Sequence, residues 1–259
     1  MQIPLFQIDA FAERVFSGNP AAVCPLVSWL PDAVMQAVAA ENNLSETAFF
    51  VPQDDGYAIR WFTPRTEVDL CGHATLASAH VVLRHLTTGR TAVRFSSQSG
   101  PLAVHLAGDL LALDFPSRPP VARPAPAGLA AAVGGAPRET LFARDAMLVY
   151  ATEDEVRALR PDFARLAALD LFGVIVTAPG RDVDFVSRYF APREGIPEDP
   201  VTGSAHCTLV PYWAQRLRRT TLRARQVSER GGDLFCEDRG DRVSIAGRAV
   251  TYLEGTIDV

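Results

Sequence analysis

The chain has 259 residues, of which 48% are hydrophobic and 21% are charged. This is the composition of a globular protein with enough length for one large core or two smaller ones. The formal net charge is −5, and all 25 basic residues are arginine. The absence of lysine excludes a Schiff-base lysine, a phosphate-loop lysine and a biotin attachment site. The negative net charge favours neither nucleic acid nor an acidic membrane, so we predict neither as a partner.

The cysteines and the N-terminal segment indicate the cellular compartment. Four cysteines are too few for a disulfide framework in a chain of this length. The first residues lack a basic segment followed by an apolar stretch, so we expect no secretory signal. No apolar run reaches the roughly 18 residues that a membrane-spanning helix needs. These features predict a reduced, cytoplasmic protein.

The first half of the chain has the pattern of short strands with two helices. Strands are predicted from β-branched and aromatic residues at 3–11, 21–26, 45–51, 57–63, 92–95, 102–106 and 110–115. Helical spacing of apolar residues predicts helices over 31–43 and 74–86. The second of these helices is almost wholly apolar, so we expect it to be buried on most sides.

A proline-rich stretch divides the chain. Five prolines lie between Pro116 and Pro126, which is typical of a stiff, extended linker. We therefore predict an N-terminal domain over residues 1–116 and a C-terminal domain over 117–259, with a last strand that can return to the first domain. In the second half we predict a helix over 203–217 and strands at 147–151, 172–177, 183–190, 221–227, 233–236, 242–245 and 251–257.

A short internal repeat suggests that the two halves are related. The hexamer Arg60–Arg65 matches Arg188–Arg193 at four of six positions, 128 residues later. Each copy is followed by an acidic stretch and then by a glycine, Gly72 or Gly203, that opens an apolar helix. The shared continuation favours duplication over a chance match.

The two glycine-started helices suggest an anion site, because the start of a helix presents free N–H groups and the positive end of its dipole. Glu46 lies just before apolar strand residues, where burial would raise its pKa and suit it to acid/base chemistry near neutral pH. His73 directly follows Gly72 and could transfer a proton or donate a hydrogen bond. Asp199 precedes Gly203 and could act in the same way or cap the turn.

Four motifs in order then carry a family resemblance: Ser17–Val23, Asn43–Phe49, Phe62–Pro64 with Cys71–Thr75, and Asp199–Ser204. Over essentially the whole chain, the sequence resembles the phenazine-biosynthesis, PhzF-like isomerase family. The resemblance implies an α+β fold of the diaminopimelate-epimerase type. This fold has two pseudo-symmetric domains, each a curled, mostly antiparallel, barrel-like sheet around a central helix, with the site at the cleft between the domains.

The resemblance also implies a chemistry, namely isomerisation of a small carboxylate-bearing substrate without cofactor or metal. It assigns the proton shuttle to Glu46, and it makes His73 and Asp199 its assistants. Binding of the substrate falls to a further set of residues, Asn19, Ser45, Gly72, Gly203 and Ser204. A homodimer is the implied assembly. The stretch from Gln226 to Gly232 departs from the family pattern, so the identity of the substrate does not follow from the resemblance.

Three alternatives compete with this prediction. A two-thiol racemase or epimerase could use Cys71, but no second thiol lies within residues 199–202, and Cys207 comes a helical turn after Gly203. A zinc site could combine Cys71 and His73 with His206 and Cys207. Adjacent helical residues point about 100° apart, however, and would rarely both bind one ion. A non-enzymatic binding or scaffold protein could also use the same fold.

An arginine cluster at the end of the helix predicted over 203–217 suggests a different kind of partner. Its members could contact nucleic acid, but no aromatic side chains are interleaved with them as a stacking platform. We therefore favour a solvated surface for Arg216, Arg218, Arg219, Arg223 and Arg225.

Overall fold

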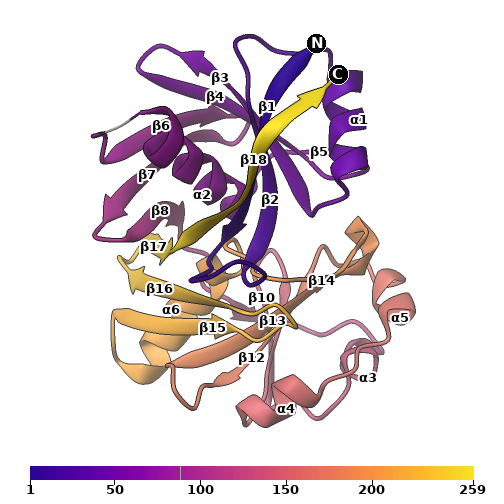
Figure 1. Ribbon diagram of the computed structural model, residues 1–259. Helices are drawn as coiled ribbons and strands as arrows, with labels where there is room; N and C mark the ends of the chain where they lie inside the picture. The colour runs from indigo at the N-terminus through magenta and orange to yellow at the C-terminus, as the bar shows by residue number, and fades with distance from the viewer. Residues whose placement is uncertain (88) are drawn as a thin grey trace. The chain divides into compact units, whose positions relative to one another are not determined.

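The computed structural model describes residues 1–87 and 89–259, which form two compact units (Figure 1). The first unit contains Met1–Asp114 and Ala246–Val259, and the second contains Phe115–Ile245. Both consist mainly of strands with a few helices, so the predicted α+β class is confirmed. The chain passes into the second unit two residues before the predicted boundary.

In the first unit the strands pair in the order β18, β1, β2, β3, β4, β6, β7, β8, and β5 adds to β4. The β2–β3 and β4–β6 pairs are parallel, and the others are antiparallel. The strands are β1 (Gln2–Ala10), β2 (Asn19–Pro25), β3 (Glu46–Gln53), β4 (Gly56–Phe62), β5 (Glu67–Val68), β6 (Ala92–Ser97), β7 (Gly100–Ala107), β8 (Leu110–Pro116) and β18 (Ala249–Asp258). The helices are α1 (Asp32–Asn42), α2 (Gly72–Val81) and a π-helical turn (Val82–Leu86).

In the second unit the pairing order is β9, β10, β11, β12, β13, β15, β16, with β14 added to β13. The strands are β9 (Val121–Ala122), β10 (Glu139–Phe142), β11 (Ala146–Val149), β12 (Val174–Pro179), β13 (Phe185–Ala191), β14 (Ile196–Asp199), β15 (Thr221–Gln226) and β16 (Gly232–Asp238), and β17 (Arg242–Gly247) leads back to the first unit. The helices are α3 (Leu129–Val133), α4 (Glu153–Ala158), α5 (Phe163–Ala167), a 3-10 turn (Pro192–Glu194) and α6 (His206–Leu217).

The two units share one topology. In each, a parallel pair (β2–β3 or β11–β12) is followed by an antiparallel strand, a short added strand and a second parallel pair (β4–β6 or β13–β15). This correspondence extends well beyond the hexamer and supports the duplication read from the sequence.

A buried helix follows the short added strand in both units. Nine of the ten residues of α2 are buried, and its two hydroxyl side chains turn back to the backbone. Thr75 Oγ1 donates to the Cys71 carbonyl, and Ser78 Oγ donates to the Ala74 carbonyl at 2.8 Å. In α6, Trp213 donates to Thr177 Oγ1 at 3.0 Å and stacks on Phe185. Such internal bonds allow an almost apolar helix to be buried without leaving hydroxyl groups unsatisfied.

Apolar packing against the sheets completes each core. In the first unit, Met35 of α1 packs with Phe49 and Phe62 of the sheet. In the second unit, Leu129 of α3 packs in one cluster with Phe190 of β13. Each unit therefore has a core of its own.

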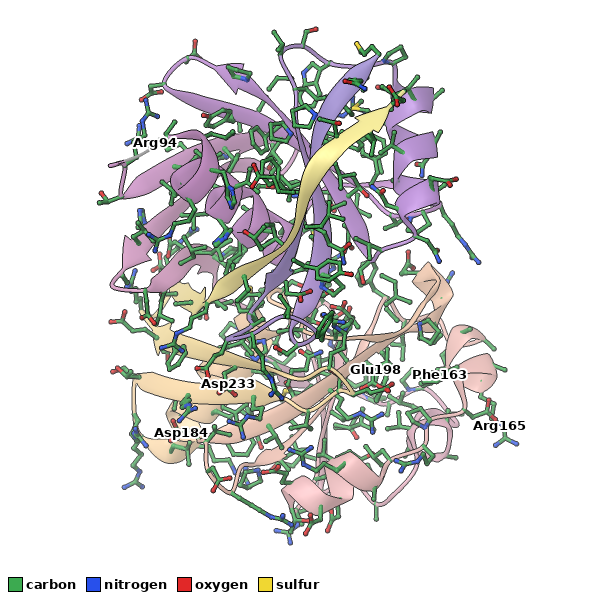
Figure 2. All side chains as sticks on the ribbon, viewed as in Figure 1. Arg94, Phe163, Arg165, Asp184, Glu198 and Asp233 are labelled. Carbon is green, nitrogen blue, oxygen red and sulfur yellow. The ribbon has the colours of Figure 1, made fainter. Side chains whose placement is uncertain are left out.

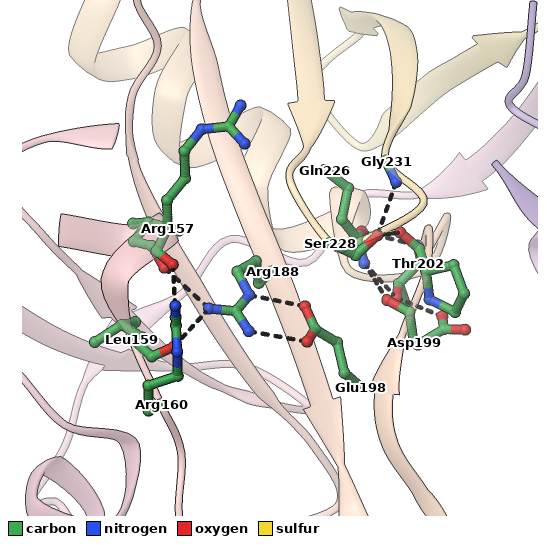
Figure 3. A network of polar contacts seen from close by, with 12 residues as sticks. Arg157, Leu159, Arg160, Arg188, Glu198, Asp199, Thr202, Gln226, Ser228 and Gly231 are labelled. Carbon is green, nitrogen blue, oxygen red and sulfur yellow. Dashed lines mark hydrogen bonds and ion pairs between the residues drawn. The ribbon is translucent and has the colours of Figure 1, made fainter. Parts of the chain in front are cut away.

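The repeated hexamer forms the same ion pair in both units. Arg60 donates to both carboxylate oxygens of Glu67 at 2.7 Å, and its guanidinium lies 5.1 Å from the Phe62 ring centre. Arg188 donates to both oxygens of Glu198 at 2.7 and 2.9 Å, and it lies 5.0 Å from the Phe190 ring centre. Figure 3 shows the second of these pairs. In each unit the pair ties the long strand to the short strand that precedes the central helix, and such bidentate pairs fix geometry as well as charge.

Several sequence predictions need correction. The proline-rich stretch is not a bare linker, because it contains β9, which pairs with β10. The second central helix begins at His206 rather than Gly203, and residues 203–205 form a tighter turn with i to i+3 hydrogen bonds. The short elements α3, α4, α5, β10 and β14 were not predicted, since segments of four to six residues carry too little periodicity.

In residues 1–87 and 89–259, no helix combines the length and the apolar character that crossing a membrane requires.

We predict that the two Arg–Glu pairs contribute unequally to stability. The Arg188 side chain is 11% exposed and also donates to the carbonyls of Val156 and Leu159 at 3.1 and 3.0 Å, whereas the Arg60 side chain is 21% exposed. Replacing Arg188 by Met should lower the free energy of unfolding by about 2–3 kcal/mol, because it leaves the buried carbonyls of Val156 and Leu159 without their donor and also removes the pair with the half-buried Glu198. Replacing Arg60 by Met should cost less. Urea denaturation measures both; equal losses would contradict this ranking.

Candidate functional site

Three polar side chains meet at the buried end of the first unit's central helix. Glu46 is the first residue of β3, Asn19 is the first of β2, and His73 is the second of α2. The parallel pairing of β2 with β3 brings the starts of both strands to the same edge. His73 Nε2 lies 3.1 Å from Glu46 Oε2, and Asn19 Nδ2 lies 3.2 Å from His73 Nδ1. All three residues are buried.

The position of Asn19 depends on the glycine that precedes it. Gly18 has φ +68°, which L side chains rarely adopt, and a Cβ there would collide with the carbonyl oxygen of Ala10. Only glycine fits such a turn without strain. The Ser17–Val23 motif therefore places the Asn19 amide against the His73 ring.

The contacts define the ionisation state and the tautomer of His73. Burial lowers the pKa of His73 to about 3, so the ring is neutral at neutral pH. The nitrogen of the Asn19 amide has only donors, so His73 Nδ1 accepts from it and the ring proton sits on Nε2. This Nε2 lies 3.1 Å from Glu46 Oε2, close enough for the ring and the carboxylate to be in direct contact. The structure thus brings two of the predicted site residues, Glu46 and His73, into contact.

Cys71 completes this set. It caps the N-terminus of α2, and its Sγ lies 3.5 Å from His73 Nδ1. Gly72, between Cys71 and His73, is buried and begins the helix. Ser45 lies in the bend immediately before Glu46 and is half-buried.

The second unit holds the remaining predicted residues. Asp199 is the last residue of β14 and is buried. Thr202 Oγ1 donates to Asp199 Oδ2, so a side chain three residues later holds this carboxylate (Figure 3). Gly203 and Ser204 lie in the turn before α6, and their carbonyls accept from the N–H groups of His206 and Cys207. Each set of residues is thus organised within its own unit.

A buried glutamine, which the sequence analysis did not select as a site residue, holds the Asp199 loop. Gln226 Oε1 accepts from the Thr202 N–H at 2.9 Å, and its Nε2 donates to the Asp199 carbonyl at 2.7 Å. Ser228 Oγ donates to the Pro200 carbonyl at 2.7 Å, which adds a second tie to the same loop (Figure 3). The sequence did contain a signal for it. Side chains alternate between the two faces of a strand, so Gln226 shares the buried face of β15 with Leu222 and Ala224, where an apolar residue would be expected.

The cysteine and histidine at the start of α6 are structural. His206 Nδ1 donates to the Thr202 carbonyl at 2.9 Å, and burial lowers the pKa of His206 to about 4. Burial also raises the pKa of the Cys207 thiol to about 12, so it stays protonated. A second catalytic thiolate is therefore not available at Cys207.

The arginine cluster is largely paired with acids in the second unit. Arg216 bonds Glu139 at 2.8 Å and Arg219 bonds Asp184 at 2.6 Å. Arg223 and Arg225 share Asp233; Figure 2 labels Asp184 and Asp233. These ion pairs partly neutralise the positive charge that a nucleic acid would contact. They therefore agree with the expectation that the cluster forms a solvated surface.

We predict that Gln226 is required to hold the Asp199 loop. Gln226→Met should lower the free energy of unfolding by about 2–3 kcal/mol, because it leaves the Thr202 N–H and the Asp199 carbonyl buried without their partner. It should also speed amide exchange at Thr202 by at least tenfold. Gln215→Met, at an exposed position of α6, is the matched control. Unchanged exchange at Thr202 in the Gln226 variant would show that the loop holds itself.

Comparisons with known proteins agree with the fold. The family model for phenazine biosynthesis-like proteins, PhzC-PhzF, matches residues 8–255. An uncharacterized isomerase of Pseudomonas aeruginosa is 53% identical over 257 residues, which cover 99% of each chain. The crystal structure of a PhzF-family protein from Enterococcus faecalis gives a TM-score of 0.97 at 52% identity and covers 100% of both chains.

A more distant structure extends the likeness to epimerases. A predicted epimerase from P. aeruginosa gives a TM-score of 0.77 at 25% identity, covering 98% of this chain and 99% of its own. Two further bacterial relatives, 52% and 44% identical, are named uncharacterized isomerases, in agreement with the predicted enzyme class. The chain therefore belongs to the PhzF family of phenazine-biosynthesis-like isomerases, on the diaminopimelate-epimerase-like fold.

Proposed function

We propose that the protein is a cofactor-independent isomerase that moves a proton within a small carboxylate-bearing substrate. Glu46 carries the proton, and His73 and Asp199 assist. Asn19 and Ser45 help to shape the substrate site. The single observation that carries the proposal is the buried contact between Glu46 and a neutral His73.

This contact suits a proton shuttle. Glu46 in its carboxylate form removes a proton from a substrate carbon and becomes a carboxylic acid. It then returns the proton to another carbon, so the substrate is isomerised and the enzyme is restored. A neutral His73 is no imidazolium acid at neutral pH, but its Nε2 lies 3.1 Å from Glu46 Oε2, where a small rotation of either side chain would let the ring N–H orient the carboxylate. His73 is thus proposed as a hydrogen-bond donor to Glu46.

The anionic part of the substrate requires its own binding groups. The start of α2 at Gly72 presents N–H groups and the positive end of a ten-residue helix, and the turn at Gly203 and Ser204 precedes the N-terminus of α6. Helix starts of this kind bind carboxylates through backbone N–H groups. We assign substrate-carboxylate binding to these three residues.

The two-thiol racemase remains a weaker candidate. Cys71 Sγ contacts His73, so one thiol is suitably placed. The mechanism needs a second thiolate, however, and burial keeps Cys207 protonated with a pKa of about 12. Assembly as a homodimer, a cytoplasmic location and the absence of a cofactor stay predictions.

We predict that Glu46→Gln abolishes solvent-proton exchange into the substrate. A panel of small cyclic and amino carboxylates is incubated with the enzyme in D₂O, and deuterium incorporation is followed by mass spectrometry. Glutamine keeps an oxygen acceptor for His73 but cannot take the substrate proton, so the exchange rate should fall by about 10²–10⁴-fold. Glu41→Gln, at an exposed position of α1, should exchange like the wild type.

The same assay separates the alternatives. The proposal requires Cys71→Ser to keep most of the exchange activity, whereas a two-thiol mechanism requires its loss. Equal exchange by wild type and Glu46→Gln would contradict the proton shuttle. If the wild type exchanges with no compound in a broad panel, the binding or scaffold alternative gains support.

A further inference from the structure

A second polar cluster lies where the end of α2 and the turn after it pack against β18 (Figure 1). His80 Nε2 and His85 Nε2 both contact one hydroxyl oxygen, Thr251 Oγ1, at 3.1 and 2.9 Å. Glu254 Oε2 lies 3.2 Å from the other nitrogen of the second ring, His85 Nδ1. The proposed isomerisation uses none of these four side chains.

A change of helix type brings the two histidines together. Residues five apart in an α-helix point about 140° away from each other. After Val81, however, the helix widens into a π-helical turn, in which the Thr87 N–H donates to the Val82 carbonyl at 2.8 Å. This turn lets His80 and His85 face the same oxygen. Single π-helical turns inside helices are frequent at functional sites.

A β-bulge does the same for the two residues of β18. The register between β1 and β18 shifts by one residue at Tyr252. Residues three apart in a regular strand point to opposite faces, but the extra residue allows Thr251 and Glu254 to contact the same His85 ring. Such bulges are over-represented next to active sites, where they redirect a side chain.

The contacts set the direction of the hydrogen bonds. A hydroxyl has one hydrogen, so Thr251 donates to one of the two rings and accepts from the other. The Glu254 carboxylate beside His85 Nδ1 favours a proton on that nitrogen, which leaves Nε2 of the neutral ring as the acceptor. Thr251 therefore donates to His85 and accepts from His80. The Phe6 ring, with its centre 4.9 Å from that of His85, limits rotation of the imidazole.

We propose that Thr251, His85 and Glu254 form a nucleophilic triad that accepts acyl groups from activated carboxylic esters. A triad needs a hydroxyl within hydrogen-bond distance of an unprotonated ring nitrogen, and a third group at the opposite nitrogen of the ring. The 2.9 Å and 3.2 Å contacts of His85 meet both requirements.

The reaction needs no co-reactant other than water. Thr251 Oγ1 attacks the ester carbonyl carbon while its proton passes to His85 Nε2. The bond from that carbon to the alcohol oxygen breaks, and the alcohol leaves with the proton. Water then attacks the acyl-threonine and gives a proton to His85, which returns it to Thr251 as the acid is released. The N–H of His80 stabilises the negative charge that develops on the Thr251 oxygen.

The cluster is accessible, and competing nucleophiles are few. The side chains of His85 and Glu254 are 21% and 60% exposed, and Thr251 is half-buried. The sequence contains no lysine, and all four cysteines are buried. The side chains that most readily react with activated esters are thus missing or shielded, so background acylation should be low.

Acetylation by p-nitrophenyl acetate tests the proposal on the full chain. We expect the wild type to release nitrophenolate, and acid quenching to trap the mass of one acetyl group, which peptide mapping locates on Thr251. An acetyl group on another residue, such as the N-terminal amine, would overturn the proposal. The readout needs no isomerase substrate, so its result is independent of the proposed function.

Variants identify the role of each side chain. Thr251→Val keeps the shape of the side chain and should slow nitrophenolate release by about 10²-fold, whereas Thr251→Ser should retain it. His85→Gln should also slow release by about 10²-fold, through loss of the base. Glu254→Gln should slow it by about tenfold, because this carboxylate is largely exposed.

The control is His105→Gln, at an exposed position of β7, which should react like the wild type. Circular dichroism establishes that each variant is folded. A folded Thr251→Val variant that releases nitrophenolate as fast as the wild type would rule out Thr251 as the nucleophile. An unchanged rate in folded His85→Gln would rule out the triad.

Discussion

The bidentate Arg–Glu pair is the interaction on which both halves of the structure depend. It occurs once in each unit, between Arg60 and Glu67 and between Arg188 and Glu198. In both units it ties a long strand to the short strand that leads into the helix start, and in the second unit the residue after Glu198 is Asp199 itself. A planar guanidinium binds both oxygens of a carboxylate in one preferred orientation. The pair therefore fixes the path of the backbone just before the segment that contains the candidate site residues.

Burial then sets the chemical character of these residues. His73 lies among apolar and small side chains of α2, and desolvation holds it neutral at neutral pH. A neutral ring lies beside the Glu46 carboxylate without adding a positive charge to the buried site. In the second unit, Thr202 and Gln226 hold Asp199 by neutral hydrogen bonds. Both units thus orient a carboxylate with uncharged side chains.

The sequence predicted the long elements and three of the residues that the structure brings together, Asn19, Glu46 and His73, for identifiable physical reasons. The central helix of the first unit was predictable from its continuous apolar run, and Glu46 and His73 from their motifs. The partners of Arg60 and Arg188 were not predictable. Glu67 and Glu198 lie outside the repeated hexamers, and only the fold brings each of them next to its arginine. The role of Gln226 requires a contact across 24 residues with Thr202, and a local pattern can show only that a polar side chain points inward. The tautomer of His73 likewise follows from its three-dimensional contact with Asn19.

The central claim is that the His73 ring beside the Glu46 carboxylate is neutral and carries its proton on Nε2. Nitrogen-15 NMR of histidine-labelled protein measures it most directly, with His73→Gln used to assign the signal. The account predicts the Nε2–H tautomer of a neutral ring, unchanged from pH 8 down to about 4, because burial lowers the pKa of His73 to about 3. A His73 ring that titrates near pH 6.5, or that carries its proton on Nδ1, would contradict the account.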